Sequence, residues 1–185
     1  WRAPIPWFEK IQATLHLTHY GVHLLIALTA LLSVPCVLVP GATADPRGLW
    51  TLFVPLLLAL AGPTLLHVYA QKYLEKRWVR PSDLVWLTLV GIGIAVSNGV
   101  AVLSAFRSNR LEFIRTPKVG TGEGRSRYRI QGDGLLAAEG ALAMYCIAAT
   151  TALIWFGVWE ITPFLFLDGL GFATVAELGR RELAS

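Results

Sequence analysis

L-E-F-I-R-T-P-K-V-G-T-G-E-G, at Leu111–Gly124, is the polar stretch that divides the long apolar segments of the chain. Lysine, arginine, threonine, proline and glycine concentrate here without an apolar run. Pro117 lacks an amide hydrogen and clashes with the preceding turn of a helix, so the stretch cannot form a helix interior. We therefore predict a basic loop at this position, and a basic loop is suited to bind an anionic ligand.

The composition of the chain indicates a membrane protein. Of its 185 residues 55% are hydrophobic, and the mean hydropathy is +0.55. A soluble domain of this size could not bury so much apolar surface. Both cysteines, Cys36 and Cys146, lie inside apolar runs, so neither a zinc site nor a disulfide framework is expected. The net charge of +4 is modest, and we expect no nucleic-acid partner.

Four apolar segments are predicted to cross the bilayer as helices, because each approaches the length needed for a hydrocarbon core of ~30 Å. They are residues 15–40, 49–71, 135–157 and 161–178. Residues 1–14 contain Trp1 and Trp7 and are predicted to form an interfacial lead-in at the depth of the lipid headgroups. Residues 179–185 are predicted to form a basic cytosolic tail.

The distribution of positive charge predicts the topology. Of the 16 lysines and arginines, all but Arg47 fall in the lead-in, the tail and two loops, residues 72–83 and 107–134. The positive-inside rule places these clusters in the cytoplasm. A fifth apolar run, residues 84–110, would move the 107–134 loop outside if it crossed fully. We therefore predict an interfacial or re-entrant helix at 84–110, broken at Ser97-Asn98-Gly99, in an all-α membrane protein with about four transmembrane helices.

Four residues of the loop have the side chains that phosphate recognition needs. Phe113 supplies a stacking face, Arg115 and Lys118 supply positive charge, and Thr116 supplies a hydroxyl. The same residues would also suit a juxtamembrane loop that contacts anionic lipid headgroups. Both interpretations remain open from the residues alone.

The motif F-I-R-T-P-K at Phe113–Lys118 resembles the gating loop of membrane-embedded processive family 2 glycosyltransferases. These are the cellulose synthase group, and the match is better to its mannan and glucan synthase branch. The lead-in P-I-P-W-F-E-K-I-Q-A-T-L-H-L-T and the helix before the loop, A-V-S-N-G-V-A-V-L-S-A-F-R-S-N-R, resemble the corresponding segments of that group.

This resemblance implies that residues 111–124 form a cytosolic gating loop that closes over a bound nucleotide sugar. Phe113 would pack against the nucleotide, Thr116 and Lys118 would face the diphosphate, and Arg115 would add a second cation. The implied enzyme is a hexosyltransferase that polymerises a β-linked polysaccharide from a UDP- or GDP-hexose. The nascent polysaccharide would pass through a channel formed by the helices of the chain. The implied location is a bacterial-type inner or plasma membrane, with the gating loop and the C-terminus in the cytoplasm.

The catalytic motifs of that family are not in this sequence. Its metal-binding aspartates, its catalytic base and its Q-x-x-R-W segment have no counterparts here. Because the chain begins at Trp1 rather than at methionine, we expect a missing N-terminal catalytic domain, and we expect that domain to hold Mg²⁺ or Mn²⁺. We expect no catalytic residue, metal site or cofactor in this chain, which would be inactive alone.

Two other kinds of function are compatible with polar residues in the apolar segments. His16, His19 and His23 share one face of a helix, and His67 is predicted at a similar depth, so haem or a metal ion could bind. Asp168 and Glu139 are costly in lipid, and such acids occur in proton-coupled transporters. We expect structural roles for these residues but keep both alternatives.

Overall fold

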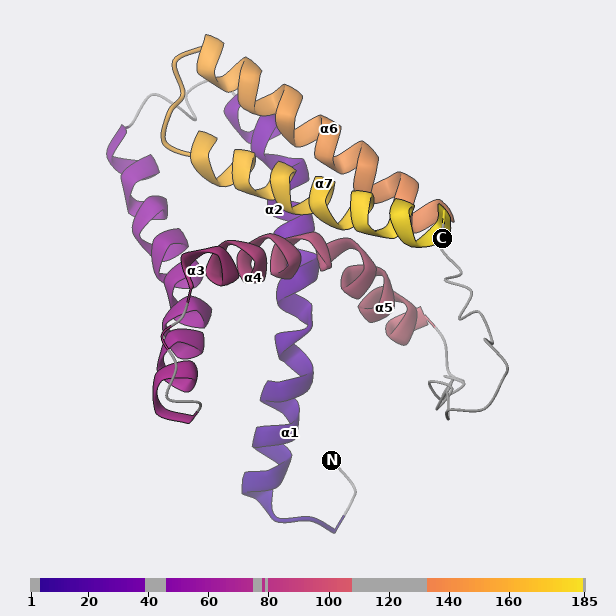
Figure 1. Ribbon diagram of the computed structural model, residues 1–185. Coiled ribbons are helices and arrows are strands. Elements are labelled where there is room, and N and C mark those ends of the chain that lie inside the picture. The colour runs from indigo at the N-terminus through magenta and orange to yellow at the C-terminus, as the bar shows by residue number, and fades with distance from the viewer. Residues whose placement is uncertain (1–3, 39–45, 75–77, 79, 108–132, 185) are drawn as a thin grey trace.

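The computed structural model describes residues 4–38, 46–74, 78, 80–107 and 133–184, and these form helices without any strand (Figure 1). The helices are α1 (Trp7–His19), α2 (Gly21–Leu38), α3 (Pro46–Leu74), α4 (Pro81–Gly93), α5 (Ala95–Arg107), α6 (Asp133–Trp155) and α7 (Thr162–Ala184). The prediction of an all-α fold is confirmed for the described residues.

The first two helices form one long rod (Figure 1). α1 and α2 are separated only at Tyr20, whose carbonyl accepts a hydrogen bond from the amide of His23 at 3.3 Å. α1 begins at Trp7, so residues 7–14 of the predicted interfacial lead-in are helical, and their depth in the membrane stays a prediction. Pro6 precedes that helix, and its carbonyl accepts from the amide of Lys10 at 3.2 Å. Proline is well placed there, since the first amides of a helix have no internal partners.

α3 is long, and α4 is its main packing partner. It includes the predicted segment 49–71 and contains two prolines, Pro55 and Pro63. An interior proline removes a backbone hydrogen bond, which membrane helices tolerate where neighbouring groups satisfy the freed carbonyl. Figure 1 shows α3 at the side of the molecule, away from α6 and α7.

The described part of the predicted interfacial or re-entrant segment, residues 84–107, consists of most of α4 (Pro81–Gly93) and all of α5 (Ala95–Arg107). α4 begins at Pro81, whose fixed φ suits the first position of a helix. The chain changes direction between α4 and α5 (Figure 1). The amide of Ile94, the residue between them, still donates to the carbonyl of Val90 at 3.0 Å. α4 packs against α7, and α5 packs against α2.

The prediction of a break at Ser97-Asn98-Gly99 is wrong, because these residues lie inside α5. The Ser97 hydroxyl donates to the carbonyl of Ile94 at 3.0 Å, so the helix satisfies this polar side chain internally. Gly99 is buried against α2, where an added Cβ would lie 3.6 Å from the Cα of Leu24. The glycine therefore permits close helix packing and does not end the helix.

α6 and α7 form a helical hairpin, and α7 lies between α6 and α4. The turn between them includes Gly157, with φ of 76°, a conformation that favours glycine. Apolar residues of the pair form most of the buried core, including Leu142, Cys146 and Phe172. α7 continues to Ala184 and so includes residues 179–184 of the predicted basic tail, whose cytosolic location stays a prediction.

Three segments of the described chain are long and apolar enough to cross a membrane. They are Trp7–Pro35, Pro81–Arg107 and Gly134–Trp155. Many large apolar side chains on these and other helices are exposed, such as Leu66 at 69% and Met144 at 70%. So much exposed apolar surface needs a non-aqueous environment, which supports the conclusion that this is a membrane protein.

Candidate functional site

The predicted gating-loop residues Phe113, Arg115, Thr116 and Lys118 lie outside the described residues. The structure describes the helices on either side of the segment. α5 ends at Arg107 and packs against α2, whereas α6 begins at Asp133 and packs mainly against α7. The two ends of the 108–132 segment are therefore attached to different pairs of helices.

The N-terminal histidines lie near one another along the α1–α2 rod. The ring centroids of His16 and His19 lie 6.0 and 6.3 Å from that of Tyr20, and His19 lies 6.4 Å from His23. His67 belongs to α3, which packs mainly against α4. Within the described ranges, no group of three or more His, Cys, Asp or Glu side chains could hold a metal ion. The haem or metal hypothesis gains no support from this arrangement.

The two acidic residues of the predicted membrane segments, Glu139 and Asp168, lie at different heights along the α6–α7 hairpin. Glu139 is buried in α6, and Asp168 is partly buried in α7. Gly169, the next residue, faces α6, where an added Cβ would lie 3.1 Å from the Cβ of Cys146. Cys146 follows Glu139 by about two helical turns, or ~10.5 Å along the axis. A proton pathway needs acids in succession, so this geometry gives the transporter hypothesis no support.

An apolar groove of about 540 Å³ runs between α2, α5 and α6. Its walls include Leu28 of α2, Leu103 of α5 and Ala141 of α6. At the α2 side, the hydroxyl of Tyr145 donates to the carbonyl of Leu31 at 2.8 Å and so links α6 to α2. The volume is within the range of small-molecule sites. The groove is absent from the sequence-based predictions because its walls come from three distant parts of the chain.

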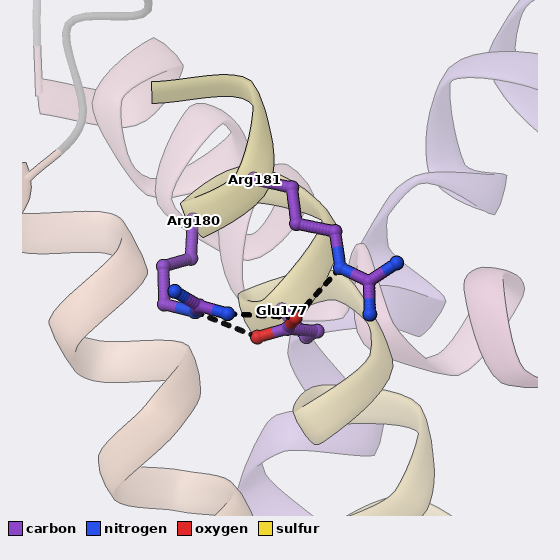
Figure 2. Close-up of polar contacts among 3 residues, drawn as sticks. All are labelled: Glu177, Arg180 and Arg181. Atoms are coloured by element: carbon purple, nitrogen blue, oxygen red, sulfur yellow. Dashed lines mark hydrogen bonds and ion pairs between the residues drawn. The ribbon is translucent and has the colours of Figure 1, made fainter. Parts of the chain in front are cut away.

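Beyond the apolar part of α7, its last turns form a charged cluster (Figure 2). The Glu177 carboxylate accepts two hydrogen bonds from Arg180, at 2.7 and 2.9 Å, and one from Nε of Arg181 at 2.7 Å. These hydrogen bonds lower the pKa of Glu177 to about 2. The cluster is exposed, so solvent and salt screen it strongly.

The Glu177 cluster should make stability depend on pH only in the acid range. Because the folded pKa is about 2 and the ordinary value is 4.5, the contribution is complete above 4.5 and is lost as the pH falls toward 2. We expect Glu177→Gln to lower the melting temperature slightly at pH 7 in low salt. The difference from the wild type should shrink between pH 4.5 and 2. Circular dichroism in micelles measures both, and a constant difference across that range would contradict the assignment.

An aromatic and cationic cluster lies at the end of α3. The rings of Tyr69 and Tyr73 are 4.3 Å apart between centroids, and Nζ of Lys72 lies 5.9 Å from the Tyr73 ring and 5.6 Å from the Trp78 ring. All four residues are exposed. Tyrosine, tryptophan and lysine gather where a helix leaves the bilayer. This cluster was not predicted from the sequence, although the i, i+4 spacing of Tyr69 and Tyr73 places them on one face of a helix.

Within the described part of the chain, these features define an all-α protein with helices that can cross a membrane and with two polar clusters at the ends of α3 and α7. The chain matches no protein-family model, and neither a curated protein nor a solved structure shows significant similarity to it.

Proposed function

We propose that the chain is the C-terminal membrane part of a processive family 2 glycosyltransferase similar to cellulose synthase-like enzymes. Its role would be to form part of the polysaccharide channel and to gate the active site with residues 111–124. The observation that supports this role is the order of elements around the motif. α5 leads into Phe113–Lys118, and the α6–α7 hairpin follows.

In this proposal the gating segment moves between two fixed helix ends. α5 packs on α2, with Gly99 against Leu24, and α6 packs on α7. Closure would be driven by contacts with the diphosphate that exist only in the closed state, since a ligand shifts an equilibrium only through such differential contacts. Arg115, Thr116 and Lys118 would provide them. Catalysis itself would come from a domain that contains the aspartates missing from this sequence.

The proposed topology has four membrane crossings. The α1–α2 rod, α3, α6 and the apolar part of α7 would cross, and α4 and α5 would remain at the cytoplasmic leaflet. Pro81–Arg107 is long and apolar enough to cross by itself. The proposal therefore rests on the positive charges of residues 72–83 and 107–134, which a fifth crossing would place on opposite sides of the membrane.

Cysteine labelling tests this topology. In a chain whose Cys36 and Cys146 are replaced by alanine, Phe156→Cys lies in the turn after α6 and should react with an impermeant maleimide added to intact cells. Gly122→Cys should react only after the membrane is permeabilised. If Gly122→Cys reacts from outside, with or without Phe156→Cys, the 107–134 loop is not cytoplasmic and the topology proposed above is wrong.

The proposed activity is tested with the whole protein encoded by the gene. Inverted membrane vesicles that contain it should incorporate labelled hexose from UDP-glucose or GDP-mannose into a polymer, in the presence of Mg²⁺ or Mn²⁺. Vesicles prepared without the protein are the control. Equal incorporation in the two preparations would contradict the proposal.

A further inference from the structure

The apolar groove between α2, α5 and α6 is open along one side, and its described lining residues come from all three helices. Among these, only Tyr145 has a polar side chain, and its hydroxyl already donates to the carbonyl of Leu31. The walls present methyl and methylene groups, from Leu28, Val100 and Leu103 among others. A sugar or nucleotide would lose hydrogen bonds to water in such a groove and gain none. The chemistry of the walls therefore suits a hydrocarbon chain.

The α5 wall of the groove ends near a positively charged side chain, that of Arg107. Val96, Val100 and Leu103 line the groove along one stripe of α5, and Arg107 follows Leu103 by four positions in the same helix. Residues four apart lie one above the other on a helix face. Arg107 is exposed at the last residue of α5, so its guanidinium can extend from the end of the apolar wall into water.

We propose that the groove is a binding site for an anionic phospholipid, with one acyl chain between α2, α5 and α6 and the phosphate bound by Arg107. An apolar groove that ends at a cation is complementary to a molecule with a hydrocarbon chain next to an anion. Beside the groove, α5 also exposes the apolar side chain of Phe106 (88%), which is compatible with lipid around this helix. This site does not depend on the proposed transferase activity, and it would order α5 directly before the 108–132 segment.

The acyl-chain part of the proposal is tested by filling the groove. The full chain is purified in detergent, supplied with equal amounts of phosphatidylglycerol and phosphatidylcholine, and examined by native mass spectrometry. One bound phosphatidylglycerol is expected. Ala141→Trp, which fills the groove, should reduce its retention about tenfold or more, because displacing two methylene groups already has that effect. Met144→Trp is the matched control on the same helix, since Met144 is exposed and does not line the groove.

Circular dichroism shows whether the variants fold, and Val100→Trp on the opposite wall replaces Ala141→Trp if the latter does not fold. Unchanged lipid retention in a folded groove-filling variant would overturn the proposal. A dimer mass that disappears with Ala141→Trp would also overturn it, because the groove would then hold a second copy of the chain.

The headgroup part is tested at Arg107. Arg107→Ala should reduce the preference for phosphatidylglycerol over phosphatidylcholine about fivefold, as expected for the loss of one cation near lipid phosphate. Arg107→Lys should retain most of the preference. Equal binding of the two lipids by the wild-type chain would overturn the assignment of an anionic ligand.

Discussion

Replacing Gly93 with alanine is expected to force α4 and α7 apart and to lower the free energy of unfolding by about 1–3 kcal/mol or more. An added Cβ would lie 2.3 Å from Cγ2 of Val175 and 2.4 Å from the carbonyl oxygen of Gly171. The valine methyl group could rotate, but the carbonyl belongs to the backbone of α7. The two helices would have to separate, with loss of the contacts between them. Thermal unfolding in micelles, followed by far-UV circular dichroism, measures the effect.

Gly91 provides the matched control, because it lies in the same helix and an added Cβ there meets no atom within 4 Å. Gly91→Ala should therefore show only the gain in helix propensity, roughly 0.5–1 kcal/mol in favour of the folded state. Opposite signs at positions two residues apart would locate the close approach of α4 and α7. If Gly93→Ala matched Gly91→Ala in stability, α4 and α7 would not approach each other closely at Gly93.

The positions of helices were more predictable from the sequence than their ends and breaks. Apolar runs such as 49–71 and 135–157 indicate helices because a backbone in lipid must satisfy its own hydrogen bonds. The polar triplet Ser97-Asn98-Gly99 resembled a break, yet its serine bonds to the carbonyl of Ile94 and its glycine contacts α2. Whether a glycine ends a helix or permits packing depends on the neighbouring helix, which a single sequence does not show.

The two candidate sites, the Phe113–Lys118 loop and the apolar groove, also differ in how far the sequence could predict them. The phosphate-binding inventory at Phe113–Lys118 is local in sequence, so it could be recognised without a structure. The groove could not be recognised from the sequence, because its walls combine residues 24–31, 95–103 and 138–145. The Tyr145–Leu31 hydrogen bond joins residues that are 114 positions apart. No local pattern predicts which apolar face remains uncovered when three such helices meet.

Lys118→Ala in the whole protein is expected to lower kcat/KM for polymer synthesis roughly 10- to 100-fold. A hydrogen bond to a charged group contributes about 1.5–3 kcal/mol, and the proposed contact joins an ammonium group to a diphosphate. The initial rate of hexose incorporation in vesicles, measured over a range of nucleotide-sugar concentrations, gives the change. If closure of the 111–124 segment positions the donor, kcat should fall together with kcat/KM, because the contact forms only in the closed state.

Two variants distinguish a diphosphate contact from a general effect of charge. Lys72→Ala removes an equal charge from the end of α3, where Nζ lies near the rings of Tyr73 and Trp78, and synthesis should be unchanged. Lys118→Arg retains the cation and should recover part of the rate, though arginine presents its donors in a different geometry. Equal losses with Lys72→Ala and Lys118→Ala would mean that both lysines act through the surface potential of the membrane. Residues 111–124 would then be a lipid-contacting loop, which is the other interpretation that their composition allows.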